Sequence, residues 1–109
     1  MPEKQIAAIA AEAREFSGLL AHATEVEAVK TAAAYSCRVR IGGRPWLLVA
    51  DGPGLKRAEV AAREAFAAGP VGWVISIGFC GGLDPGLRVG EVLIASEVIG
   101  EGGMSWGVS

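Results

Sequence analysis

Short apolar runs, separated by glycine, proline and charged residues, dominate the pattern of this chain. Five runs predict strands, at residues 6–11, 37–41, 46–50, 73–77 and 91–95. The run at 37–41 alternates apolar and polar residues, as expected of a strand with one wet face, and residues 42–45 turn it into the run at 46–50 as a hairpin. The alanine-rich run at 6–11 also fits a helix.

Two segments change to the spacing of a helix. The first follows Glu12, with apolar positions at Ala13, Phe16, Leu19, Leu20 and Ala23. The second spans residues 56–68 and ends at the glycine and proline of positions 69 and 70. Its predicted inner stripe is mostly alanine, namely Ala58, Ala61, Ala62, Ala65 and Phe66. Small residues would let this helix lie close against a sheet.

This order of elements predicts an α/β fold with a mixed central sheet flanked by helices. The runs at 6–11, 46–50, 73–77 and 91–95 are expected in one sheet, with the near-continuous apolar run 73–77 at its centre. The loops near Glu12, Asp51 and Gly78 each follow a strand, so they should meet at the carboxyl edge, where open sheets bind ligands. Residues 100–109 have no period and are expected to form an irregular tail.

Composition narrows the class of protein. The 109 residues suffice for one domain, 51% of them are hydrophobic, and the formal net charge is −2. The basic residues are scattered, which argues against nucleic acid as a partner. One histidine and two distant cysteines predict no metal site, and no cofactor is expected. No signal peptide or membrane span is apparent, so a cytoplasmic setting is expected.

Three segments together resemble the purine nucleoside phosphorylase superfamily, especially the nucleosidase branch that cleaves methylthioadenosine and S-adenosylhomocysteine. Residues 75–92 (ISIGFCGGLDPGLRVGEV) resemble the family's strand, its G-x-A-G-G-L loop and its V-G-D strand. Residues 51–58 resemble the S-G-I-G-K turn into a helix, and residues 6–19 resemble the opening strand with its acid-rich first helix. The phenylalanine in the glycine loop and the A-A-E-A-R start look closest to the hopanoid-associated phosphorylase subgroup.

The resemblance implies a catalytic role for Glu15, which matches the glutamate that positions the attacking water in nucleosidases. A glutamate in the first turn of a helix is also typical of a purely structural interaction with the helix dipole. The resemblance further implies a substrate-binding loop, formed by Phe79, Cys80, Gly81 and Gly82. Glycines let backbone amides approach a ribose or base closely, although a glycine pair also suits an ordinary turn.

Several residues have competing interpretations. Phe79 fits core packing as well as contact with a base. Cys80 stands where the family usually has alanine, which favours a small buried residue over a nucleophile. Gly52 and Gly54 could present amides to an anion at a helix N-terminus, but the geometry of helix entry explains them equally. Trp46 and Trp73 are expected in the core or at a subunit contact. His22 is expected to be a solvent-exposed helix residue.

Departures from the phosphorylases bear on the reaction. At the position of Glu15 the bacterial phosphorylases carry a phosphate-binding arginine, and in the glycine loop they carry an arginine and a serine where this chain has Ser76 and Phe79. A carboxylate repels phosphate, so the site favours hydrolysis, with phosphate retained as an alternative co-substrate.

Members of the family are longer, and their later half supplies a methionine–glutamate pair for the ribose and an aspartate for the departing purine. Neither is found after Ile99. Residues 1–99 are therefore interpreted as the N-terminal half of a phosphorylase-like domain, a fragment or a diverged remnant. Two functions stay open. One is cleavage of the N-glycosidic bond of a purine nucleoside-like small molecule, in a homo-oligomer. The other is a non-catalytic, self-associating α/β module.

Overall fold

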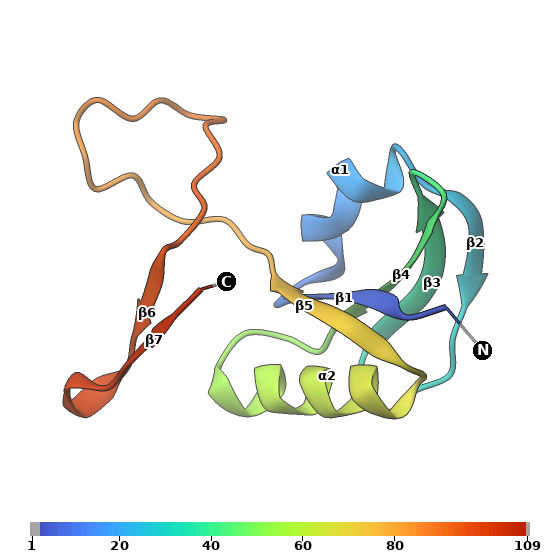
Figure 1. Cartoon of the computed structure of the whole chain (residues 1–109). Helices are drawn as coiled ribbons and strands as arrows, with labels where there is room; N and C mark the ends of the chain where they lie inside the picture. Colours follow the sequence, from blue (N-terminus) through green and yellow to red (C-terminus); the bar gives the residue numbers. More distant parts are fainter. Residues whose placement is uncertain (1–2, 109) are drawn as a thin grey trace. The chain divides into compact units, whose positions relative to one another are not determined.

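The computed structural model describes residues 3–108. Contacts divide the chain into two units, Met1–Phe79 and Cys80–Ser109. The first unit contains a mixed five-stranded sheet in the order β2-β3-β4-β1-β5 (Figure 1). Its strands are β1 (Gln5–Ala10), β2 (Thr24–Ala28), β3 (Tyr35–Ile41), β4 (Arg44–Ala50) and β5 (Val71–Ser76). The predicted α/β fold with a mixed sheet is confirmed.

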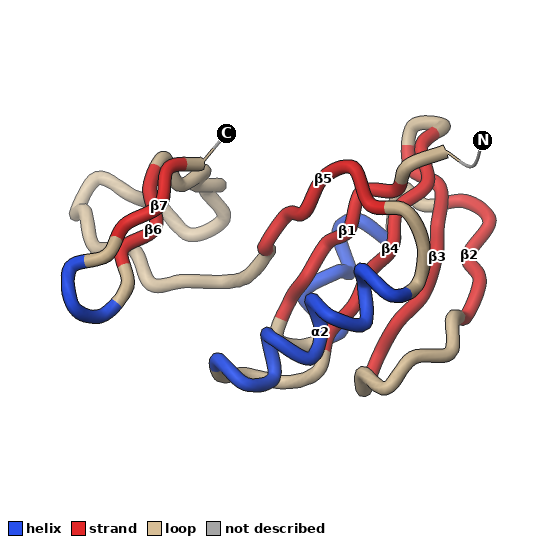
Figure 2. Tube along the Cα trace, turned by 60° about the horizontal axis from the view of Figure 1, so that its bottom comes forward, coloured by secondary structure: helices blue, strands red, loops and turns tan. Residues whose placement is uncertain are grey.

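The three strands that lead to the predicted ligand edge are parallel. β1 lies between β4 and β5, pairing Ala10 with Ala50 on one side and Ile9 with Ser76 on the other (Figure 2). The chain therefore leaves all three strands at the same edge of the sheet.

β3 and β4 form the predicted hairpin, and Ile41 pairs with Arg44 across its two-residue turn. Gly42 and Gly43 occupy this turn with φ of +58° and +78°. Two successive positive φ values match the right-handed twist of a hairpin, and glycine adopts them without strain.

One helix covers each face of the sheet (Figure 1). On one face α2 (Leu55–Ala67) packs against β1 and β4 through Ala61 and Ala65, which contact Ala7, Ile9, Leu47 and Val49. On the other face the 3-10 turn η1 (Ala13–Phe16) and the short helix α1 (Ser17–Leu20) bury Phe16 against Ala8, Ala10 and Leu48. Alternate residues of β1 serve the two clusters, as the period of a strand requires.

The inner stripe of α2 is narrower than predicted. Ala61 and Ala65 are buried and Ala62 is half-buried, but Ala58 is exposed and the Phe66 side chain is 59% exposed. Ala61 and Ala65 fill the contact of α2 with β1 and β4, and the Phe66 ring lies outside it. The first helix also stops earlier than predicted, at Leu20 rather than Ala23.

β5 lies at the edge of the sheet rather than at its centre. Its side chains from Gly72 to Ser76 are exposed, including Trp73 at 58%, so the prediction of a central strand is wrong. Trp73 is accordingly not a core residue, whereas Trp46 is half-buried and packs against the cluster around Phe16.

The second unit contains a long loop followed by a small hairpin. β6 (Glu97–Ile99) pairs with β7 (Ser105–Gly107), and η2 (Glu101–Gly103) joins them. Two predictions are therefore wrong: residues 91–95 form no strand of the main sheet, and the expected irregular tail contains a strand. Gly100 lies against the Trp106 ring, where a Cβ would come within 3.0 Å of the ring carbons. The sequence pattern gives no indication of this contact between Gly100 and Trp106.

Candidate functional site

A cleft of about 450 Å³ lies at the carboxyl edge of β1, β4 and β5 in the first unit. Its lining comes from the three loops that the sequence predicts to meet there. The lining residues are Ile9, Ala10, Ala11, Glu15, Gly52, Gly54, Leu55, Ala58, Ser76, Ile77, Gly78 and Phe79. The predicted convergence of these loops is confirmed.

Glu15 is half-buried and is the third residue of η1. The backbone N–H groups of Ala11 and Glu12 both donate to its Oε2, each at 3.0 Å. The other oxygen, Oε1, faces the turn after β5, since a Cβ built on Gly78 would lie 3.7 Å from it. One oxygen is therefore anchored to the backbone just after β1, and the second is directed toward Gly78.

Phe79 also lines the cleft, and its side chain is 74% exposed. The alternative that this ring belongs to the core is wrong. Cys80, Gly81 and Gly82 belong to the second unit and are exposed. The interpretation of Cys80 as a buried residue is therefore also wrong, while the proposed contact of these three residues with substrate stays a prediction.

The turn after β4 approaches the cleft with its two glycines. Gly52 has φ of +111° and Gly54, the residue before α2, has φ of +100°. The Gly52 N–H donates to the carbonyl of Ala11 at 2.8 Å, so this amide is engaged within the fold and is not available to an anion. The geometry of helix entry accounts for Gly52, and anion binding at Gly54 stays a prediction.

Sequence reasoning missed Ser76 and Leu55 as lining residues. Ser76 is the last residue of β5 and breaks its apolar run, and a polar residue at the carboxyl end of a parallel strand is a usable signal. Leu55 is the first residue of α2 and is 88% exposed. An exposed leucine at a helix start carries no such signal in the sequence.

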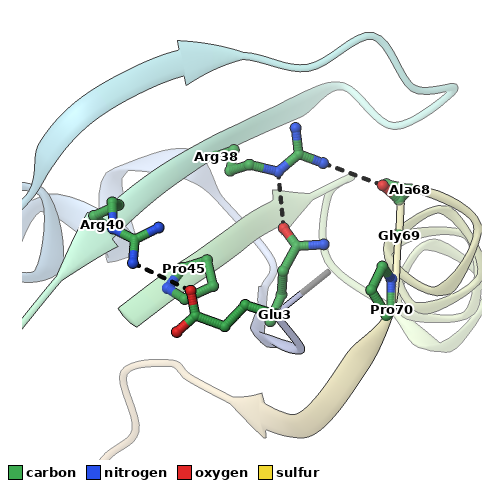
Figure 3. Close-up of a pocket in the computed structure, with 8 residues that line it drawn as sticks. Glu3, Arg38, Arg40, Pro45, Ala68, Gly69 and Pro70 are labelled. Atoms are coloured by element: carbon green, nitrogen blue, oxygen red, sulfur yellow. Dashed lines mark hydrogen bonds and ion pairs between the residues drawn. The ribbon is translucent and has the colours of Figure 1, made fainter. Parts of the chain in front are cut away.

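A second cavity, of about 240 Å³, lies beside the starts of β1, β4 and β5 (Figure 3). Both of its arginines bind acceptors of the protein itself: Arg38 donates to Gln5 and to the carbonyl of Ala68, and Arg40 pairs with Glu3 and donates to the carbonyl of Gly43. These hydrogen bonds connect β3 to β1 and to the end of α2, so we assign the cavity a structural role.

Within residues 3–108, no helix is long and apolar enough to cross a membrane. No cluster of three His, Cys, Asp or Glu side chains in that range could hold a metal ion.

A cleft at the carboxyl edge of parallel strands, lined by the loops that follow them, is the place where open α/β sheets bind small ligands. Comparison with known families is more specific. The sequence model of the phosphorylase superfamily matches residues 5–106, and the chain belongs to this superfamily.

Among solved structures, the chain is similar to the 5′-methylthioadenosine/S-adenosylhomocysteine nucleosidase from Neisseria meningitidis, crystallised in complex with methylthio-immucillin-A. The TM-score is 0.70 at 35% sequence identity, and the match covers 86% of this chain and 41% of the nucleosidase. The chain thus spans less than half the length of this relative. A search of curated protein sequences finds no significant match.

Proposed function

We propose that this chain supplies the water-activating part of an enzyme that hydrolyses the N-glycosidic bond of a purine nucleoside-like substrate. The observation that carries the proposal is the position of Glu15. Two backbone N–H groups anchor its Oε2, and its Oε1 is directed toward Gly78. The similarity to a nucleosidase crystallised with methylthio-immucillin-A supports a nucleoside-like ligand.

The anchoring of Glu15 suits a general base. Two N–H donors hold one oxygen in place, so the carboxylate does not have to be ordered when substrate arrives. The other oxygen can accept a proton from a water molecule as that water attacks the anomeric carbon of the ribose. Proton transfer of this kind contributes about 10²–10⁴-fold to a rate.

The lining of the cleft favours hydrolysis over phosphorolysis. Among the lining residues that the structure describes, Glu15 is the only charged one, and the rest are apolar side chains, glycines and Ser76. A dianionic phosphate would have to approach a carboxylate without a cation among these residues. A neutral water molecule meets no such repulsion.

Phe79 is proposed to contact the purine or an apolar substituent. An exposed aromatic ring beside an apolar cleft offers a face on which a flat base can stack. In the same proposal, the backbone of Cys80, Gly81 and Gly82 contacts the substrate.

The experiment is a chimera in which residues 5–106 replace the matched part of the neisserial nucleosidase. Methylthioadenosine hydrolysis would be followed by release of adenine, with and without phosphate. We expect Glu15→Gln to lower kcat by about 10²-fold or more with little change in KM, since it removes the proton acceptor and keeps the shape. Glu59→Gln is the matched control, because the Glu59 side chain pairs with Arg63 on the exposed surface of α2 and does not line the cleft. Equal activity of the two variants would refute the role of Glu15.

A second candidate function is a self-associating module without catalysis. The exposed edge strand β5 favours it, with Trp73, Val74 and Ile75 at 58%, 48% and 39% exposure, because an open apolar strand edge is a surface for pairing with another chain. Sedimentation of the 109-residue chain would test it: we expect a Val74→Lys variant to dissociate the oligomer, and a wild-type chain that stays monomeric contradicts this candidate.

A further inference from the structure

Asp51 is a buried carboxylate to which the proposed reaction gives no role. Its side chain is 6% exposed and it follows directly after β4. The register of β1 and β4 ends at the pair Ala10 and Ala50, so Asp51 and Ala11 leave the sheet side by side. Burying a carboxylate is costly unless its charge is paired and its oxygens accept hydrogen bonds.

Both oxygens of Asp51 have partners, from two different elements. The N–H of Ala34, in the connection between β2 and β3, donates to Oδ1 at 2.8 Å. The Arg57 guanidinium, in the first turn of α2, lies 3.5 Å from Oδ2. The Arg57 side chain also covers the turn, since its Cγ lies 3.6 Å from the Cβ position of Gly52. Asp51 therefore connects the turn between β4 and α2 to Ala34 before β3 and to Arg57 in α2.

This turn is connected to Glu15 by two hydrogen bonds. The Gly52 N–H donates to the carbonyl of Ala11 at 2.8 Å, and the Ala11 N–H donates to Glu15 Oε2 at 3.0 Å. Gly52 itself has a positive φ of +111°, a conformation open to glycine, and the chain turns from there toward α2. The backbone of Ala11 is thus held on one side by the turn and holds the carboxylate on the other.

We propose that Asp51 is a positioning residue for Glu15, acting through the Gly52 and Ala11 backbone. Its value to catalysis rests on the proposed function, but the mechanical link does not. Without the Asp51 carboxylate, the turn loses the contacts that direct the Gly52 N–H at Ala11, and the Ala11 peptide loses one of its two supports. The Glu15 carboxylate then samples more orientations at the cleft.

The test is amide hydrogen exchange by NMR on the full 109-residue chain without nucleoside, with the Glu15 carboxyl carbon resonance as a second readout. In Asp51→Ala we expect exchange at Gly52 and Ala11 to accelerate about tenfold or more while Ala8, inside β1, is unchanged, and the Glu15 resonance to move. Asp51→Asn keeps an acceptor for Ala34 and loses the charge opposite Arg57, so it should give a smaller effect at the same amides.

Asp84 provides the matched control, because it also accepts a backbone N–H, that of Gly86 at 2.7 Å, in an exposed loop of the second unit. Asp84→Ala should leave Ala11 and Gly52 unchanged. The proposal is overturned if Asp51→Ala leaves these two amides and the Glu15 resonance unchanged, or if it accelerates Ala8 equally. If Asp51→Ala does not fold, Asp51→Asn decides by the same criteria. Since no substrate is present, failure here is distinct from failure of Glu15→Gln in the chimera.

Discussion

Glu15 and Gly78 approach each other at the carboxyl edge of the sheet, with Glu15 Oε1 3.7 Å from the point where a Cβ on residue 78 would lie. These residues follow β1 and β5, which are paired in parallel. The contact therefore depends on the pairing of strands far apart in the sequence, and it defines the space in which a water molecule and a ribose would meet the carboxylate.

The size of the side chain at residue 78 should control this space. A methyl group at 3.7 Å from Oε1 makes an ordinary contact, so Gly78→Ala should keep most of the adenine release of the chimera. Gly78→Leu would place branched carbons against the carboxylate and should reduce release about tenfold or more, because small displacements of a reacting group are costly. Gly18→Leu is the control, since its Cβ position has no neighbour within 4 Å. Equal rates for the two leucine variants would contradict this view of the cleft.

The 109-residue chain alone should not release base from a nucleoside. Glu15 can serve the attacking water, but the departing purine needs an acid, and loss of general acid catalysis alone costs about 10²–10⁴-fold. Purified chain would be incubated with methylthioadenosine, adenosylhomocysteine, inosine and adenosine, with and without phosphate, and free base would be measured. Steady release that disappears in Glu15→Gln would show the prediction to be wrong.

Tyr35 should make the folded state pH-dependent in alkali. Burial, with a hydrogen bond to the Cys37 thiol at 3.1 Å, raises the pKa of Tyr35 from 10.0 to about 12. The pKa of Tyr35 is therefore higher in the folded chain than in the unfolded chain. The contribution of the neutral phenol to the free energy of unfolding is complete below pH 10 and is lost as the pH rises toward 12. Tyr35 is the single tyrosine of the chain, so the ultraviolet absorbance of tyrosinate reports it directly.

Tyr35→Phe provides the control for this titration, since it keeps the ring and removes the ionisable group. The free energy of unfolding of the wild type should fall more steeply between pH 10 and 12 than that of the variant. Titration of the wild-type phenol near pH 10 in the folded chain would contradict the assignment.

Two phenylalanines should differ sharply in their contribution to stability. Phe16 is fully buried and stacks on Tyr35 with a centroid distance of 6.1 Å, so Phe16→Ala should lower the free energy of unfolding by about 3–5 kcal/mol. Phe66 is 59% exposed on α2, and Phe66→Ala should change it by about 0.5 kcal/mol. Urea denaturation of the two variants measures the difference, and comparable losses would mean that α2 is rotated relative to the arrangement described.

Local sequence was sufficient for the hairpin and for the convergence of the site. Gly42 and Gly43 mark a turn because few other residues adopt two positive φ values in succession. Glu15 and Phe79 could be placed at one edge because both follow runs typical of parallel strands, and parallel strands end together. These conclusions need only the spacing of apolar residues, the glycines that mark turns, and the direction of the chain.

The tertiary structure alone decided which surfaces are covered. An apolar period shows that a face avoids water, but not which element packs on it. For that reason the sequence pattern predicts Phe66 in the core, although Ala61 and Ala65 fill the contact. It likewise predicts β5 at the centre of the sheet, although no strand among residues 3–108 pairs with its second edge. The run at 91–95 has the composition of a strand, yet strand formation requires a partner's hydrogen bonds, and pairing is a non-local property. The link from Asp51 to Glu15 is likewise non-local, since it passes through backbone groups brought together only by the register of β1 and β4.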